Sequence, residues 1–284
     1  MTPHFGSLSC RDAVKDFVAV SANGAEASTS VSVESHPNGS LELEQAPSLR
    51  AVLLPKRLPS LTASDSAGAQ KFRTLAVRLQ RFQKAQRLKK LLVTSSIKGE
   101  GKSVISANLA ITLARRQKTL LIDGDFYQSG LREVFGSGNQ PGLKDWWKTS
   151  SPIYGFLRRM DGLPLWYLPA GQGHEQPIDI VQSVRLAEML VEVSAHFEWV
   201  IIDSPPLLPV ADSGIWAAQA DATLLIVKHG VTPKPLLQKA LETDNLKLLG
   251  VVANEWEDTG HEYYSHYYKH THSSDHKLAL TGQG

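Results

Sequence analysis

The stretch Ser95-Ser-Ile-Lys-Gly-Glu-Gly-Lys-Ser103 decides the fold of this 284-residue chain. It follows the short apolar run Leu91 to Val93 and precedes Val104 to Ala114, where apolar residues recur at helical spacing. A strand, a glycine-containing loop and a helix in this order are typical of a phosphate-binding loop. Small residues let backbone N–H groups converge on phosphate oxygens at the N terminus of the helix. The stretch therefore predicts a site for nucleotide phosphates.

This loop departs from the consensus G-x-x-x-x-G-K-[ST] at one position. Ser96 stands where the consensus has its first glycine, so the assignment depends on the flanking strand and helix as well. Lys102 is predicted to reach the β- and γ-phosphates, and the Ser103 hydroxyl is predicted to bind Mg²⁺. The residues predicted to bind the nucleotide here are Ser96, Lys98, Gly99, Glu100, Gly101, Lys102, Ser103 and Val104.

Two other apolar runs end in carboxylates. Residues 119–122 lead into Asp123 and Asp125, and residues 199–202 end at Asp203. Strands that are apolar on both faces are typical of parallel sheets, in which ligands lie beyond the carboxyl ends of the strands. A single aspartate at such a position is commonly a helix cap or a turn residue. Three of them beside a phosphate loop favour a Mg²⁺-nucleotide site.

Composition excludes several other classes of protein. The chain has 30 Lys and Arg against 28 Asp and Glu, and it has neither zinc-ligand spacing nor an aromatic and basic ladder, so nucleic acid is not expected as a partner. Its one cysteine, Cys10, excludes an internal disulfide framework and fits a reducing compartment. No apolar run approaches the length of a transmembrane helix. We expect a soluble chain, or one attached to a membrane through a partner.

The pattern along the chain predicts one α/β domain between two tails. Residues 1–63 are rich in Ser, Ala, Glu and Pro and are predicted to be largely disordered, and residues 257–284 are predicted to form a flexible tail. Residues 64–256 predict a P-loop NTPase domain, a doubly wound, mostly parallel sheet flanked by helices. Its further predicted elements are helices at 64–87, 178–196 and 233–246 and strands at 165–168, 221–228 and 249–254, with residues 126–171 otherwise irregular.

The C-terminal tail is rich in tyrosine and histidine. Five histidines lie between His261 and His276. A flexible histidine-rich tail can bind Zn²⁺ or Ni²⁺, but a solvated polar tail explains these residues as well and is the favoured interpretation. Four tyrosines lie within six residues and are predicted to be phosphate acceptors: Tyr263, Tyr264, Tyr267 and Tyr268.

Together these motifs resemble one known family, the bacterial tyrosine kinases of capsule and exopolysaccharide systems. The resemblance extends over about residues 64–270 and includes the phosphate loop, the runs 121–125 and 200–206, Asp212 and the tyrosine-rich end. It implies a cytoplasmic autokinase that uses Mg²⁺-ATP to phosphorylate the tail tyrosines of a neighbouring subunit.

The resemblance also implies roles for single residues. Lys102, Asp123, Asp125 and Asp203 would be catalytic, and Ser103, Asp123 and Asp203 would hold the metal. Asn254 falls where relatives contact the adenine. Implied partners are a transmembrane polysaccharide co-polymerase as activator, further copies of the chain and a cognate tyrosine phosphatase. The protein would then associate peripherally with the inner face of the cell membrane.

Several positions depart from the family pattern. Gln70, Arg73 and Ala76 stand where the oligomerisation helix usually reads E-x-x-R-x-x-R, which bears on ring assembly. Tyr127 replaces an arginine, and Lys98 replaces a proline, which bears on activity.

Two other functions stay open from the sequence. The first is a positioning or partitioning ATPase, which would carry a signature lysine where this chain has Ile97. The second is a scaffold of the polysaccharide machinery that binds ATP without transferring phosphate. The substitutions at Gln70, Ala76 and Tyr127 keep this second function open.

Overall fold

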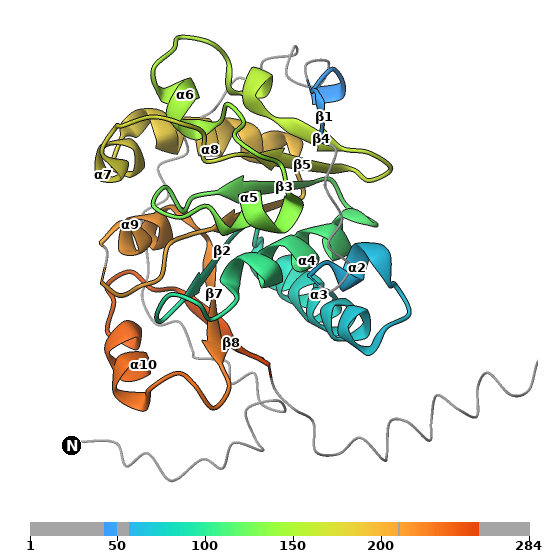
Figure 1. The fold of residues 1–284 in the computed structure, drawn as a ribbon, viewed down its shortest axis with the longest axis vertical. Coiled ribbons are helices and arrows are strands. Elements are labelled where there is room, and N and C mark those ends of the chain that lie inside the picture. The colour runs from blue at the N-terminus through green and yellow to red at the C-terminus, as the bar shows by residue number, and fades with distance from the viewer. Residues whose placement is uncertain (1–42, 50–56, 210, 256–284) are drawn as a thin grey trace, which may run out of the picture.

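The computed structural model describes residues 43–49, 57–209 and 211–255, which contain one mixed sheet flanked by helices (Figure 1). The strand order is β1-β4-β5-β3-β6-β2-β7-β8, and all neighbouring strands are parallel except β4 and β5. The strands are β1 (Ser48–Leu49), β2 (Lys90–Ser95), β3 (Thr119–Asp123), β4 (Arg158–Met160), β5 (Leu165–Leu168), β6 (Trp199–Asp203), β7 (Ala222–Lys228) and β8 (Leu248–Asn254).

Helices cover both faces of this sheet. One face packs against α2 (Pro59–Thr62), α3 (Ala67–Gln86), α4 (Lys102–Ala114) and α5 (Gly130–Phe135). The other packs against α6 (Leu143–Trp147), the 3₁₀ helix η1 (Ile153–Phe156), α7 (Pro177–Val181), α8 (Val184–His196) and α9 (Asp212–Gln219). A last helix, α10 (Lys234–Leu241), lies beside β7 and β8 (Figure 1). The predicted α/β class with a doubly wound, mostly parallel sheet is confirmed.

The central strands supply side chains to both cores, because successive residues of a strand point to opposite faces. In β6, Trp199 and Ile201 pack towards α3 and α4, whereas Val200 and Ile202 pack towards α8 and α9. Every residue of β3 and of β6 is buried. This double burial explains why both strands read as unbroken apolar runs.

The sheet topology brings the predicted site together at one edge. β3 and β6 are neighbours, and their register places Asp123 directly opposite Asp203. β2 lies on the other side of β6 and leads through the glycine loop into α4. The ends of three adjacent parallel strands therefore meet where the sequence places the loop and the aspartates.

Some predicted elements differ from the structure. The helix expected at 178–196 is two helices, because the Ser183 hydroxyl caps a new start by accepting the N–H of Leu186 at 3.1 Å. The helix expected at 233–246 ends at Leu241. Residues 126–171 contain α5, α6, η1 and β4 besides the predicted strand at 165–168. These elements are too short to show periodicity in a sequence.

The ordered domain extends further towards the N terminus than residue 64. Leu43, Leu49 and Leu58 are buried, and β1 pairs with β4 at the edge of the sheet. The described part of 1–63 is therefore structured, whereas the remainder lies outside the described residues. The tail with its four tyrosines also lies outside them. No helix among residues 43–49, 57–209 and 211–255 is long and apolar enough to cross a bilayer.

Candidate active site

The phosphate loop turns into α4 through two glycines in the left-handed region. Gly99 and Gly101 have φ values of +88° and +90°, which other residues rarely adopt. A Cβ at Gly101 would also lie 2.1 Å from Nδ2 of Asn254. The backbone conformation therefore favours glycine at position 101, where it is the N-cap of α4, and any larger residue would also displace the Asn254 side chain.

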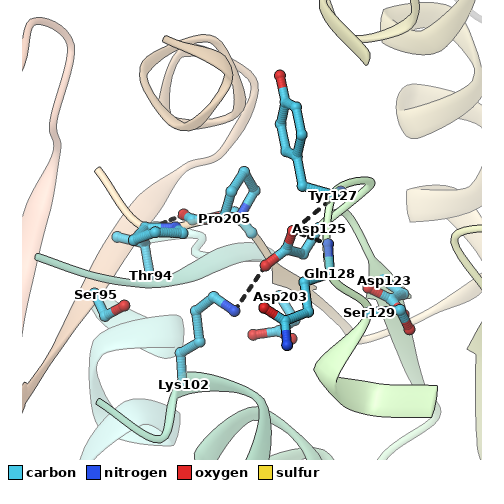
Figure 2. Close-up of polar contacts among 12 residues, drawn as sticks. Thr94, Ser95, Lys102, Asp123, Asp125, Tyr127, Gln128, Ser129, Asp203 and Pro205 are labelled. Carbon is cyan, nitrogen blue, oxygen red and sulfur yellow. Dashed lines mark hydrogen bonds and ion pairs between the residues drawn. The ribbon is translucent and has the colours of Figure 1, made fainter. Parts of the chain in front are cut away.

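Lys102, the first residue of α4, forms a buried ion pair. Its Nζ lies 2.8 Å from Oδ2 of Asp125, and Figure 2 shows the two side chains pointing towards each other. Burial alone would lower the pKa of the Lys102 ammonium, but the carboxylates of Asp203 and Asp125 outweigh it and raise the pKa above its ordinary value. The lysine is therefore charged and aimed at the space between the loop and the strand ends.

Asp203, at the end of β6, is held by donors from α4. The Ser106 hydroxyl donates to Oδ1 at 3.0 Å, and Ser103 also hydrogen-bonds the carboxylate, while Oδ2 is buried without a partner. Burial raises the pKa of Asp203 to about 6, and the nearby Lys102 opposes this shift.

Asp123, at the end of β3, is held from its other side. Its Oδ2 accepts hydrogen bonds from the hydroxyls of Ser129 and Tyr167, the latter at 3.2 Å, while Oδ1 is buried without a partner. Burial and then the neighbouring Asp203 raise its pKa to about 7. The two facing carboxylates therefore each keep one buried oxygen with no hydrogen bond.

These orphaned oxygens fit a magnesium ion. Mg²⁺ prefers hard oxygen ligands and commonly takes only one or two carboxylates, the rest being water and substrate phosphates. Asp203 and the Ser103 hydroxyl could supply protein ligands, with Asp123 opposite. Gly130 leaves room for this hydroxyl, since a Cβ there would lie 2.4 Å from Ser103 Oγ. Among the described residues no cluster of three or more His, Cys, Asp or Glu could hold a metal ion by itself.

The loop after β3 contains the third predicted aspartate. Oδ1 of Asp125 accepts the backbone N–H groups of Gln128 at 3.0 Å and Tyr127 at 3.3 Å, which fixes the carboxylate that holds Lys102.

The Tyr127 ring points away from Lys102 in Figure 2, and this residue is 57% exposed. Partial burial and the nearby Asp212 raise the pKa of Tyr127 to about 12. Asp212 is itself buried, and its Oδ2 has no partner.

The other predicted binding residues lie around the loop in different environments. Ser96 is fully buried and its hydroxyl has no partner, whereas Lys98 and Gly99 are exposed. Asn254, at the end of β8, donates its amide to the backbone carbonyl of Glu100 at 3.0 Å. The structure therefore brings Asn254 against the phosphate loop.

Similar proteins were found among individual sequences and solved structures, whereas no family model matches. The tyrosine-protein kinase CpsD of Streptococcus pneumoniae is 32% identical over 182 residues, which cover 62% of this chain and 80% of CpsD. The succinoglycan biosynthesis transport protein ExoP of Rhizobium meliloti is 30% identical over 201 residues, covering 68% of this chain and 25% of ExoP. The solved structure of the chimerical protein CapA2B2 superposes with a TM-score of 0.66 at 25% identity, covering 79% of this chain and all of that one.

The chain belongs to the bacterial tyrosine kinases. In this kinase, three supporting side chains were not among the predicted site residues: Ser106, Ser129 and Tyr167, which hold the two strand-end aspartates. Ser106 lies one helical turn after Lys102, a spacing that places both on one face of α4. Ser129, the N-cap of α5, lies only six residues after Asp123, whereas Tyr167 reaches Asp123 from 44 positions away, a contact that the sequence does not signal.

Proposed function

We propose that this kinase transfers the γ-phosphate of Mg²⁺-ATP to its own C-terminal tyrosines, in trans between neighbouring copies. The observation that carries the proposal is the Lys102 ammonium among three carboxylates, beside a glycine loop at the ends of parallel strands. Phosphoryl transfer depends mostly on positioning and on neutralising charge, and this arrangement suits both.

The described residues divide these tasks. Lys102 would hold the phosphates by giving up part of its pairing with Asp125, and the loop N–H groups would bind the same oxygens. Bound Mg²⁺ supplies neutralisation of phosphate charge. Asp123, whose pKa of about 7 lies near neutrality, is suited to accept the proton of a tyrosine hydroxyl. A phenol of pKa about 10 needs such a base, because it is a poor nucleophile at neutral pH.

We infer that the acceptors are Tyr263, Tyr264, Tyr267 and Tyr268, which begin nine residues after Asn254. That segment could extend at most about 30 Å, which is enough to reach either its own site or a neighbour's. The family favours a neighbour. A transmembrane polysaccharide co-polymerase as activator and a cognate phosphatase would complete the system, with Asn254 contacting the adenine. The polysaccharide role is supported by the name of the relative ExoP.

The experiment that tests this function is phosphopeptide mass spectrometry. The full chain, incubated with Mg²⁺-ATP and a cytoplasmic activator segment, should gain phosphate on one or more of the four tyrosines. Lys102→Met should gain none while remaining folded by circular dichroism. If ATP binds but wild type and Lys102→Met are equally unmodified, the chain is a scaffold. If ATP instead drives dimers that trap two nucleotides, it is a positioning ATPase.

A further inference from the structure

Glu100 is a charged residue buried inside a loop that is expected to bind anions. Only 2% of it is exposed, although a carboxylate is costly to bury unless hydrogen bonds compensate its charge. One oxygen, Oε2, accepts the backbone N–H of Ile97 at 2.9 Å from within the same loop. This bond closes the loop across residues 97–100 and leaves the Ile97 N–H engaged with Glu100 rather than directed to a phosphate.

The other oxygen of Glu100 is bound from outside the loop. Oε1 accepts the hydroxyl of Thr232, which lies in the turn between β7 and α10. The backbone N–H of Lys228 donates to Thr232 Oγ1 at 3.0 Å and lies 3.4 Å from Glu100 Oε1, and the carbonyl of Lys228, 3.1 Å from Oγ1, is a second acceptor for the hydroxyl proton. Hydrogen bonds to an ionised acceptor are stronger than neutral ones, and the one from Thr232 to Glu100 joins residues 132 positions apart.

A second contact holds the same loop residue through its backbone. Asn254 donates to the Glu100 carbonyl at 3.0 Å, and the carbonyl of Asn254 accepts the N–H of His229 at 2.9 Å. Thr232, after the end of β7, therefore binds the Glu100 side chain, and Asn254, at the end of β8, binds its main chain. We call the Glu100 carboxylate and the Thr232 hydroxyl the brace.

We propose that Glu100 is a positioning residue for nucleotide binding, which acts through the brace to hold the loop in its phosphate-binding conformation. Gly99 and Gly101, on either side of Glu100, have positive φ values that the loop must keep for its N–H groups to converge. Fixing this conformation before the ligand arrives removes an ordering cost from binding. The proposal rests on the nucleotide-binding part of the proposed function and not on phosphate transfer.

The test measures Mg²⁺-ATP binding by titration calorimetry on the full chain. Glu100→Ala should raise the Kd at least tenfold, whereas Glu100→Gln, which keeps one acceptor oxygen, should restore part of the affinity. Thr232→Val, which removes the hydroxyl at constant shape, should raise the Kd about threefold, and Thr232→Ser should recover it. Glu242→Gln changes an exposed carboxylate at the end of α10 and is the matched control.

A double variant separates positioning from a general loss of stability. If the brace acts as one unit, adding Thr232→Val to Glu100→Ala should weaken binding no further. In the kinase assay, KM for ATP should rise in Thr232→Val while kcat changes less than twofold. Wild-type affinity in both single variants, or fully additive effects in the double variant, would overturn the proposal. Since the primary readout is binding, these results stand whether or not the tail tyrosines are phosphorylated.

Discussion

The two halves of the active site are built in opposite ways. In the phosphate loop, the Glu100 carboxylate accepts bonds at both oxygens and two glycines fix the backbone. At the facing strand ends, Asp123 and Asp203 each keep a buried oxygen without a partner, and both have raised pKa values. Both oxygens of the Glu100 carboxylate are hydrogen-bonded, one of them by Thr232 from outside the loop, whereas Asp123 and Asp203 each lack a partner at one oxygen.

The loop is held in one conformation before a ligand binds, whereas the strand ends carry the electrostatic cost of buried carboxylates. Buried like charges destabilise a fold when no counterion is bound, and the same charges create affinity for a cation. The positive charge of Lys102 offsets part of this cost at Asp203. The carboxylate half therefore trades stability for function, and removing its charges should affect the two properties in opposite directions.

Asp203→Asn tests this exchange of stability for function directly, and we expect it to change activity strongly. We expect phosphorylation of the tail to fall about a hundredfold to a thousandfold, the cost of losing one well-placed electrostatic group. The nucleotide-free protein should at the same time melt a few degrees higher, because one of two facing carboxylates becomes neutral. Initial rates and differential scanning calorimetry measure the two effects. Asp161→Asn, at an exposed position, is the control, and a lower melting temperature with full activity would refute the trade.

A second expectation concerns pH and stability without nucleotide or metal. Because the pKa of Asp123 is about 7 and that of Asp203 about 6 in the folded state, against 3.8 ordinarily, the folded chain binds protons more readily. The free energy of unfolding should therefore rise as pH falls from about 7.5 to 5.5, by an amount on the order of 1 to 3 kcal/mol. Urea denaturation in EDTA measures the trend, and Asp123→Asn should flatten it. A stability that increases towards pH 7.5 would contradict this account.

Tyr127→Arg should have a modest effect, because residue 127 lies at the margin of the carboxylate half. Asp212 is buried there with one unpartnered oxygen, and a guanidinium in place of the phenol could pair with it. We expect the initial rate of phosphorylation to rise about twofold to fivefold, since the loop of Asp125 would be held more firmly. Tyr127→Phe, which adds no charge, should leave the rate within about twofold of wild type. A rate that falls in Tyr127→Arg would show that the tyrosine is the better residue in this chain.

The sequence was sufficient for those parts of the site that depend on local pattern. A buried strand or helix directly flanks the glycine loop, Lys102 and each of the three aspartates. The carboxyl ends of neighbouring parallel strands lie at the same edge of a sheet. That edge is where the structure brings them together. The class of the fold followed from the same alternation of strands and helices.

Other parts of the fold and site depend on contacts that no local pattern encodes. The hydroxyl of Tyr167 reaches Asp123 only because β5 pairs with β3, and Thr232 reaches Glu100 across the sheet end. The short elements α5 and α6 are set by packing rather than by periodicity. The structured N-terminal residues were missed for the same reason, since Leu43 and Leu49 lie in a stretch whose short apolar patches show no sustained periodicity.

Those N-terminal residues have a practical consequence for handling the protein. β1 covers the open side of β4, and the carbonyl of Leu43 accepts the indole N–H of Trp166 at 2.9 Å. A shortened chain that starts at Arg57 would retain every residue of the candidate active site. It would expose β4 as an edge strand and leave the indole N–H of Trp166 without its partner. The unpaired N–H and C=O groups of an edge strand can form hydrogen bonds with a strand of another molecule. Aggregation of such a fragment would then result from the loss of β1 and not from a defect in nucleotide binding.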